Sequence, residues 1–399
     1  MNKSAFITTI LRTPVGKYGG ALASVRPDDL LAGVLSEVVK ANPSIDVSQI
    51  EEVIAGAANQ SGEDNRNVAR MAALLAGLPE TVAGITVNRL CASGLQAIMD
   101  CARGIMLNQG NLYLAGGVES MSRAPFVLAK TDEPFSRKTE LYDTTIGWRF
   151  TNPELVRKHQ PYSMGETAEN VASKWKITRE AQDRLGLLSQ QKYFQAASQN
   201  KFKEELVSVS VRKGKEITIV SRDEYPRETS LEKLAALKPA FREGGTVTAG
   251  NSSGINDGAA AALIASEDAI RSFGLKPLVR IVSMASAGVD PAYMGIGPVP
   301  AVKKALQRAG LSIKDIGLFE LNEAFASQVL GCIQELDVDP SLVNVNGGSI
   351  AIGHPLGCSG VRISATLIHE MQKRKIKYGV ATMCVGVGQG VAVVYEKSE

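Results

Sequence analysis

Leu112-Tyr113-Leu114-Ala115-Gly116-Gly117 (LYLAGG) is a short apolar run, and its counterpart Tyr378–Met383 (YGVATM) stands 266 residues further along the chain. Two further pairs recur at the same offset: Ile50–Ala55 (IEEVIA) with Ile316–Leu321 (IGLFEL), and Ser93-Gly94 with Ser359-Gly360. Three matches at one offset, in one order, indicate that the chain contains two duplicated halves.

Runs of strand length alternate with helix-periodic segments around these repeats. The first half reads as an initial strand within residues 1–10, and then helix and strand alternate over 29–41, 50–55, 68–78, 84–88, 94–108 and 111–117. The second half repeats the pattern from a helix at 299–309. Strands that alternate with helices predict α/β architecture, with largely parallel sheets covered by helices.

The middle of the chain departs from this pattern. Residues 123–165 are polar, dotted with aromatic residues and too long for an ordinary connection, so we interpret them as an inserted loop region for binding or oligomer contacts. A helix over 166–200 and a strand pair over 206–220 follow, and 246–262 (TVTAGNSSGINDGAAAA) predicts a glycine-rich turn leading into a helix. We therefore predict a discontinuous first domain (1–122 plus 251–275), a loop domain (123–250) and a second core half (276–399).

Composition narrows the class of protein. The chain has 399 residues with a formal net charge of +3 and both signs interspersed, which does not favour a nucleic-acid partner. No apolar run reaches the roughly 18 residues of a membrane span, and the first residues are too short a run for a signal peptide. Five cysteines without a CxxC pair, and only three histidines, predict reduced thiols in the cytoplasm and no bound metal.

Two cysteines and one histidine occupy settings suited to covalent chemistry. Cys91 follows a predicted strand and precedes a predicted helix, where the helix dipole favours an anion and is expected to lower the thiol pKa. His354 lies between glycines in a bend that ends on Pro355, which suits a fixed imidazole that accepts a proton from a thiol. Cys384 ends a strand and precedes Gly386, in a segment whose amides could face a developing oxyanion.

Each of these residues also has an ordinary structural explanation. Cys91 could be a small buried apolar side chain, and His354 a loop histidine. The glycines after Cys384 could form a phosphate-cradling loop or a plain turn. Asn322, which follows the predicted strand 317–321, is by itself more often a helix N-cap than part of a site.

Together the pieces resemble a thiolase, a CoA-dependent acyltransferase. The resemblance covers essentially the whole chain and is carried by six ordered motifs: NRLCASGLQAI (88–98), AGGVESMSRAP (115–125), TVTAGNSSGINDGAA (246–260), NEAFA (322–326), GGSIAIGHPLGCSG (347–360) and CVGVGQG (384–390). It implies a five-layered αβαβα fold of two similar halves with a loop domain inserted in the first.

The resemblance also implies roles for individual residues. Cys91 resembles the acylated nucleophile, His354 the base that activates it, and Cys384 the acid/base that moves the α-proton. Asn322 resembles the holder of a water in one oxyanion hole, and the amides of Cys91 and Gly386 resemble a second hole. The CoA-binding pattern falls on Met164, Arg227, Ala249, Ser253, Ala324 and Phe325, with CoA and acetyl-CoA as substrates and no permanently bound cofactor.

Within the family, three segments are similar to the β-ketoadipyl-CoA thiolase branch: 62–79, 141–153 and 294–302. That branch cleaves 3-oxoadipyl-CoA to succinyl-CoA and acetyl-CoA. Two departures stand against a simple assignment: Gly165 replaces the proline usual in that branch, and Ser163 replaces the histidine of many biosynthetic thiolases. Acetoacetyl-CoA, other 3-oxoacyl-CoA substrates of fatty-acid β-oxidation, and 3-oxoadipyl-CoA therefore stay open.

Two other classes compete with a thiolase. A decarboxylating ketoacyl synthase shares the fold but lacks the second catalytic thiol, so Cys384 speaks against it. A CoA-binding relative that has lost catalysis would not need the full set of catalytic candidates. The family resemblance further implies a homo-oligomer, more a tetramer than a dimer, with residues 123–150 at a dimer–dimer contact.

Overall fold

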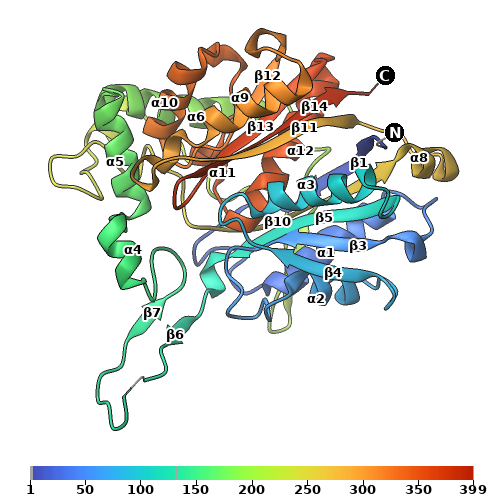
Figure 1. Cartoon of the computed structure of the whole chain (residues 1–399), viewed down its shortest axis with the longest axis horizontal. Helices are drawn as coiled ribbons and strands as arrows, with labels where there is room; N and C mark the ends of the chain where they lie inside the picture. The colour runs from blue at the N-terminus through green and yellow to red at the C-terminus, as the bar shows by residue number, and fades with distance from the viewer. Residues whose placement is uncertain (1–2, 132, 399) are drawn as a thin grey trace.

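The computed structural model describes residues 3–131 and 133–398, and its core is one mixed sheet flanked by helices (Figure 1). The strands lie in the order β12-β13-β14-β11-β1-β10-β5-β3-β4. Elements of the first half are β1 (Ala5–Arg12), α1 (Pro27–Lys40), β3 (Glu52–Gly56), α2 (Val68–Leu75), β4 (Ala83–Val87), α3 (Ser93–Met106), β5 (Leu112–Ser120) and β10 (Asn256–Ser266). Elements of the second half are β11 (Val279–Gly288), α9 (Pro298–Ala309), β12 (Leu318–Leu321), α10 (Ala326–Leu336), α12 (Leu356–Arg374), β13 (Tyr378–Val385) and β14 (Gln389–Lys397).

Strand pairing confirms the duplication that the 266-residue offset predicts. β3 runs parallel to β5 in the first half, and β12 runs parallel to β13 in the second. β5 then pairs antiparallel with β10, as β13 pairs antiparallel with β14. The halves are joined where β1 meets β11, through the pairs Phe6–Arg280 and Ile7–Val279.

Three apolar clusters separate the layers of the fold. One packs α1 and α2 under the first half-sheet, one packs α3 and α12 between the half-sheets, and one packs α9 and α10 over the second half-sheet. Side chains of β10 alternate between the first two clusters, Ala260 facing the middle and Ala261 the outside. The result is the expected five-layered αβαβα arrangement, with α3 and α12 in its centre (Figure 1).

The alanine-rich stretch at 256–266 corrects one expectation. Its composition favours a helix, but the residues form β10, which is buried along its whole length between β1 and β5. Small side chains let helices pack closely on both faces of a central strand, so tertiary packing overrides helix propensity. The chain after the loop region thus returns into the first half-sheet, as the glycine-rich turn indicates. The exact domain boundaries stay a prediction.

Three other expectations needed adjustment. The helix expected over 166–200 is two helices, α5 (Met164–Lys174) and α6 (Arg179–Ser198), separated at Lys176, whose φ is +54°. The sequence also predicts a strand over 342–346, before the His354 bend, and this strand reduces to a single bridge between Phe319 and Val343. The glycine-rich bend before His354 contains a short helix, α11 (Ser349–Ile352).

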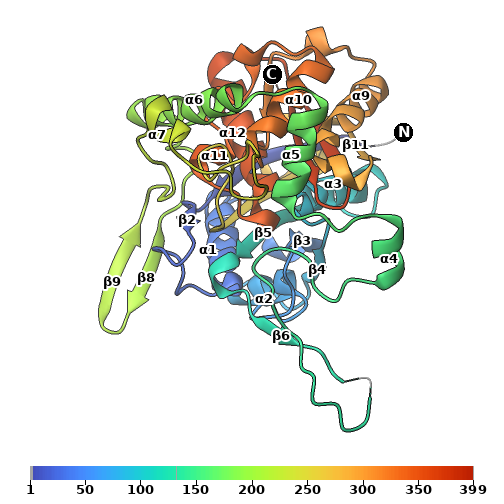
Figure 2. The same ribbon diagram turned by 90° about the vertical axis from the view of Figure 1, so that its left-hand side faces the viewer.

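The loop region carries two hairpins, seen in Figure 2 to project from the body of the molecule. One contains β6 (Phe126–Leu128) and β7 (Leu141–Asp143), followed by α4 (Pro153–Lys158). The other contains β8 (Val209–Lys213) and β9 (Glu216–Val220), the strand pair expected from the sequence, and α7 (Leu231–Ala235) follows it. None of the described helices is long and apolar enough to cross a bilayer.

Candidate active site

Cys91 lies on a tight turn between β4 and α3, as the sequence predicts. Leu90 has a φ of +48°, an uncommon conformation for a branched side chain, so the turn needs support. Ser93 supplies it, because its hydroxyl donates to the Leu90 carbonyl (2.7 Å) and accepts from the Arg89 N–H (2.9 Å). The turn holds Cys91 two residues before the start of α3.

The thiol of Cys91 corrects an electrostatic expectation. Removal from water raises the pKa of Cys91 to about 11, and the charge of Glu119 adds to that rise. Backbone N–H groups of Gly386 and of Cys91 itself bond to the sulfur and lower the pKa, but by less than burial raises it. The expected lowering at a helix start is therefore wrong in direction, since desolvation dominates. The thiol is protonated at neutral pH, and a base must take its proton before it attacks.

Cys384 comes from the other half of the chain and lies close to Cys91. It sits near the end of β13, paired with Gly390 of β14, and is almost completely buried. Burial raises its pKa well above the usual range, and proximity to Cys91 contributes to the rise. Gly386, in the turn that follows, directs its amide at the Cys91 sulfur. Both thiols and the Gly386 amide are thus in one place.

His354 is held in one tautomer by the start of α12. Its Nδ1 lies 2.6 Å from the Ser359 hydroxyl, which itself donates to the Pro355 carbonyl (2.8 Å). Because the single hydroxyl proton of Ser359 is used in this way, Ser359 accepts a proton from Nδ1, and Nε2 is left as an acceptor. Burial, with a smaller contribution from Arg362, lowers the pKa of His354 to about 3. The imidazole is therefore neutral, with Nε2 able to accept a hydrogen bond.

Asn322 contacts the free nitrogen of that imidazole. Its Nδ2 lies 3.3 Å from His354 Nε2, and its Oδ1 accepts from the Ser349 hydroxyl (2.6 Å). Helix α10 begins only at Ala326, with Phe325 as its N-cap. The helix-cap explanation for Asn322 is therefore wrong, and its side chain belongs to the His354 group.

The two central helices bring the Cys91 turn and the His354 turn together. A Cβ on Gly94 would lie 2.5 Å from the Gly357 carbonyl oxygen, and one on Gly360 would lie 2.0 Å from the Leu95 amide nitrogen. Any larger side chain would force α3 and α12 apart. The repeated Ser-Gly pair thus has a packing function in both halves, and the sequence offset detects it without revealing why.

The buried carboxylate of Glu119 stabilises the turn that carries His354. Glu119, near the end of β5, accepts N–H bonds from Ala58 (2.9 Å), Asn59 (2.9 Å) and Gly357 (2.8 Å). Burial raises its pKa to about 7, against the opposing effect of the three amides. Glu119 therefore ties the His354 turn to the loop after β3.

The six residues assigned to CoA by resemblance form one connected band. The guanidinium of Arg227 donates to the Ala249 carbonyl (2.6 Å), and the amide and hydroxyl of Ser253 donate to the Ala324 carbonyl (3.0 and 3.2 Å). Phe325 and Ala324 pack with Cys384, and Met164 packs against the same cluster. The band therefore runs from the partly exposed Arg227 to the buried thiol.

Some residues of the site were missed in the sequence. Ser349 and Ser359 orient Asn322 and His354, and Glu119 holds the turn, yet none carries a catalytic signature by itself. Ser359 does stand in the internal repeat opposite Ser93, and both serines tie a turn that bears a candidate catalytic residue. The match between Ser93 and Ser359 in the repeat was the one feature of the sequence that could have indicated a role for Ser359.

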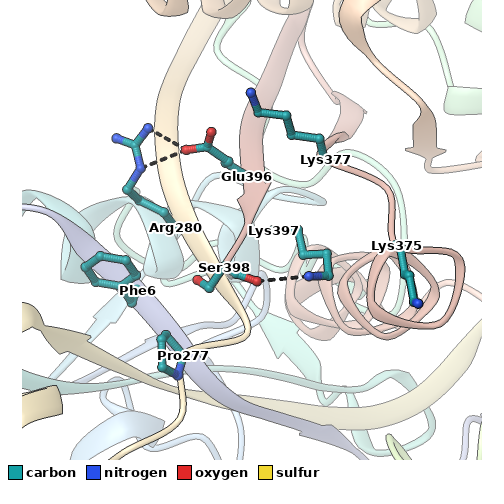
Figure 3. A pocket seen from close by; sticks show the side chains of 8 residues that line it. All are labelled: Phe6, Pro277, Arg280, Lys375, Lys377, Glu396, Lys397 and Ser398. Carbon is teal, nitrogen blue, oxygen red and sulfur yellow. Dashed lines mark hydrogen bonds and ion pairs between the residues drawn. The ribbon is translucent and has the colours of Figure 1, made fainter.

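A surface pocket of about 530 Å³ lies elsewhere (Figure 3). It is lined by Lys375, Lys377 and Lys397 at the far end of β13 and β14, beside the Arg280–Glu396 ion pair. Gly390, opposite Cys384, and Glu396 are six residues apart on β14, about 20 Å at ~3.3 Å per residue. This cavity is therefore separate from the cysteines. Within 3–131 and 133–398, no group of three or more His, Cys, Asp or Glu side chains is arranged to hold a metal.

The arrangement has the parts needed for acyl transfer through a thiol. A neutral imidazole can take the proton of one thiol, which then carries an acyl group. A second thiol remains free to move another proton. Amides of Cys91 and Gly386 converge on the reacting sulfur, where they can bond to an oxyanion.

Comparison with known proteins gives full-length matches. The family model "Thiolase, N-terminal domain" matches residues 5–268, and "Thiolase, C-terminal domain" matches residues 275–397. A 3-oxoadipyl-CoA/3-oxo-5,6-dehydrosuberyl-CoA thiolase of Escherichia coli is 54% identical over 99% of this chain and 100% of its own. A β-ketoadipyl-CoA thiolase of Pseudomonas aeruginosa is 52% identical over the full length of both chains.

Solved structures agree with these sequence matches. An acetyl-CoA acetyltransferase of Bacillus anthracis superposes with a TM-score of 0.93 at 42% identity, covering 100% of this chain and 99% of the other. A human mitochondrial 3-ketoacyl-CoA thiolase in complex with CoA gives a TM-score of 0.92 at 41% identity, covering 99% of this chain and 98% of the other.

Proposed function

The chain belongs to the thiolase family and is an acyltransferase that works on CoA thioesters; from that premise we propose that Cys91 carries the acyl group and Cys384 moves the α-proton. The observation that carries this division is the convergence of the two thiols, one from each half, with the Gly386 amide directed at Cys91. Asn322 Nδ2 and His354 Nε2 lie 3.3 Å apart, and once Nε2 holds the proton taken from Cys91 both can donate toward the thioester oxygen.

The proposed reaction proceeds in two half-reactions. In the first, the imidazole of His354 takes the Cys91 proton, the sulfur attacks the thioester carbonyl, and the leaving CoA takes the proton of Cys384 as the acyl-enzyme forms. In the second, the Cys384 thiolate left by that step removes an α-proton from acetyl-CoA, the carbanion attacks the acyl-enzyme, and the released Cys91 regains its proton from His354. Cleavage runs the same steps in reverse. A single thiol could not hold the acyl group and transfer the α-proton at once.

Two alanine variants test this division. Cys91→Ala is expected to abolish both thiolysis and acetylation of the protein by labelled acetyl-CoA. Cys384→Ala is expected to retain acetylation yet lose exchange of the acetyl-CoA α-protons with solvent. Full activity of the first variant, or normal exchange in the second, contradicts the assignment.

We propose that the substrate of this chain is 3-oxoadipyl-CoA, which is cleaved to succinyl-CoA and acetyl-CoA. Support comes from relatives of that printed activity at 52–54% identity over their full lengths. An acetyl-CoA acetyltransferase of Escherichia coli, 47% identical over 99% of both chains, marks the alternative of acetoacetyl-CoA. The substrates differ in one property that a protein can read directly, a distal carboxylate.

Arg149 is the side chain we assign to that carboxylate. Its neighbour Trp148 donates from Nε1 to the Tyr162 carbonyl (2.9 Å), which places the Arg149 segment beside the start of α5. Met164, the first residue of α5, reaches toward Gly386: a Cβ on Gly386 would lie 3.5 Å from the Met164 sulfur. Arg149 is partly buried and has no ion pair or hydrogen bond within the described part of the chain. A guanidinium in that state favours a carboxylate ligand.

The departure at Gly165 has a structural reason that leaves this assignment open. A Cβ there would lie 2.1 Å from the ring of Phe241, so Phe241 occupies the space that a proline would need. Phe241 in turn packs edge-on against Phe325 (ring centroids 6.1 Å apart), inside the CoA band. The difference from the branch therefore lies in the packing of the band and not in a charge.

Substrate comparison tests the dicarboxylate assignment. Wild-type enzyme is assayed with 3-oxoadipyl-CoA, acetoacetyl-CoA and a medium-chain 3-oxoacyl-CoA, and kcat/KM is expected to be highest for the first. Arg149→Gln is expected to lower that value by about tenfold or more, the worth of one charge-assisted hydrogen bond, and to spare acetoacetyl-CoA. Arg157→Gln, an exposed arginine paired with Glu154 on α4, is the matched control. Preference for acetoacetyl-CoA in the wild type overturns the assignment.

We also propose a homotetramer in the cytoplasm. The β6–β7 arm exposes large apolar side chains, with Phe126 68%, Leu141 64% and Phe135 fully exposed, on a segment that projects from the body (Figures 1 and 2). Such a surface is expected to be covered by a second copy. The free thiols of the proposed site suit a reducing compartment. Light scattering on the wild type and on Phe126→Ser/Leu141→Ser, expected to shift from tetramer to dimer, tests the assembly.

A further inference from the structure

Arg362 is an arginine without access to water. It lies on α12 in the centre of the molecule, its side chain fully buried. Its Nε and Nη1 atoms have no hydrogen-bond partner among the described residues, and the nearest carboxylate oxygen of these residues, on Glu320, is 3.8 Å from Nη1. Burial of a guanidinium with unpaired donors costs several kcal/mol. Such a cost calls for a function that the fold alone does not supply.

Within the part of the chain that the structure describes, Arg362 makes one hydrogen bond, and it leads to the candidate active site. Nη2 donates to the hydroxyl of Ser349 (2.5 Å), and that hydroxyl donates to Oδ1 of Asn322 (2.6 Å). The other end of the Asn322 amide, Nδ2, lies 3.3 Å from His354 Nε2. All four side chains are buried.

The direction of each bond in this chain is set by its first member. A guanidinium can only donate, so Ser349 accepts from Arg362 and must direct its single proton elsewhere. Oδ1 of Asn322 receives that proton, which fixes the amide with Nδ2 toward His354. A flipped amide would turn Oδ1 toward the imidazole and leave Nδ2 against the Ser349 hydroxyl.

We propose that Arg362 is a positioning residue for the α-proton step of the reaction, acting through Ser349 to hold the Asn322 amide with its N–H toward His354. Because the guanidinium of Arg362 can only donate, these hydrogen bonds can run in only one direction. If Ser349 or Asn322 reversed its bond, the guanidinium would lose its acceptor. The inference rests on the proposed roles of Asn322 and His354 and extends them to two residues that touch no substrate.

The charge of Arg362 has a second effect on the same group. It contributes to the lowering of the His354 pKa, and so helps keep the imidazole neutral. The groups that act on Arg362 are Glu320 on β12, Arg12 on β1, Glu205 after α6, and Cys358 on α12 itself. Of these Glu320 is the nearest carboxylate, and burial raises its own pKa to about 8 despite the attraction of Arg362. Removal of the arginine is thus expected to raise the pKa of His354.

Ser349→Ala is the variant that breaks the chain with least disturbance to packing. We expect at least a tenfold loss in the rate of α-proton exchange of acetyl-CoA, with acetylation of Cys91 changed less than twofold. The reason is that His354 keeps its tautomer, set by Ser359, while the Asn322 amide loses its fixed direction. Ser364→Ala is the matched control, since Ser364 is a buried serine of α12 whose hydroxyl contacts Gly360 and Tyr395 instead.

Arg362→Met adds an independent readout, the pH profile of acetylation. We expect its acidic limb to move to higher pH, and exchange to fall as in Ser349→Ala. The double variant Ser349→Ala/Arg362→Met is expected to be no slower in exchange than Arg362→Met alone, because both act on one amide. If Arg362→Met does not fold, Ser349→Ala still decides.

Two results overturn the inference and leave the proposed function standing. One is normal exchange in Ser349→Ala, and the other is equal loss in exchange and acetylation, which would mark a general structural defect. Asn322→Ala distinguishes a failure of the inference about Arg362 from a failure of the proposed function. If that variant exchanges α-protons normally, the role of Asn322 itself fails; if it loses exchange while Ser349→Ala does not, only the inference fails.

Discussion

Removal of the Ser359 hydroxyl is the most direct test of how this fold prepares His354. Ser359→Ala removes the acceptor for His354 Nδ1, 2.6 Å away, and the donor to the Pro355 carbonyl, 2.8 Å away. The side chain of Ser359 is fully buried and that of His354 nearly so, at 5% exposure, so water is not at hand to replace the lost partner. Without this acceptor, the imidazole is no longer held in the tautomer that carries the proton on Nδ1.

The size of the effect follows from these contacts. A buried N–H left without a partner costs about 1–3 kcal/mol. The cost is larger when the imidazole carries the proton of Cys91, because a charged donor makes the stronger bond. We therefore expect kcat to fall by roughly tenfold to a hundredfold, at about 1.4 kcal/mol per factor of ten, while KM for the CoA thioester changes little.

The assay is steady-state thiolysis of acetoacetyl-CoA, paired with single-turnover acetylation of Cys91. Both rates are expected to fall together in Ser359→Ala, since the imidazole acts on the Cys91 proton. Ser364→Ala, which removes a buried hydroxyl from the same helix without touching His354, is expected to retain both rates. Unchanged acetylation in Ser359→Ala, or an equal loss in Ser364→Ala, refutes the reasoning.

Three further perturbations have definite expected outcomes. The folded pKa of His354 is about 3 against 6.5 when unfolded, so the unfolded chain binds more protons between these values. The free energy of unfolding should then be unaffected by His354 above pH 6.5 and should fall on acidification toward pH 3, by up to about 1.4 kcal/mol per pH unit. Denaturant titrations across this window should show a weaker dependence of stability on pH in His354→Gln than in the wild type. An equal dependence would contradict the conclusion that burial lowers the pKa of His354. Glu119→Ala leaves three backbone N–H groups without an acceptor, so unfolding in urea should show a loss of about 3 kcal/mol or more in the free energy of unfolding. A loss under about 1 kcal/mol would argue against the role of Glu119 in holding the His354 turn to the loop after β3. Gly360→Ala places a Cβ 2.0 Å from the Leu95 amide and should lower the melting temperature by many degrees, whereas Gly33→Ala, a control on α1 with no atom within 4 Å of its Cβ, should leave it within a degree or two.

Much of the site could be predicted because its chemistry is local to short motifs. Cys91 and His354 were predicted in turns marked by small residues, and Cys384 at the end of a strand, and the structure places each of them there. Their surroundings could not be predicted in the same way. The thiol pKa of Cys91 was expected to fall and in fact rises, because a helix start is visible in sequence while the depth of burial is not. Ser349 and Ser359 were passed over because a serine acquires its role from what lies 2.6 Å away.

The same distinction holds for the fold. By itself the sequence determined two duplicated halves of alternating strands and helices, since hydrophobic periodicity and the 266-residue offset are properties of the chain. Only the tertiary structure decided that the alanine-rich segment 256–266 is the strand β10 and not a helix, because burial on both faces outweighs local propensity. Only it brought Cys91 and Cys384, 293 positions apart in the sequence, beside one Gly386 amide. That approach depends on the glycines that let α3 and α12 touch, a contact between halves that no local pattern contains.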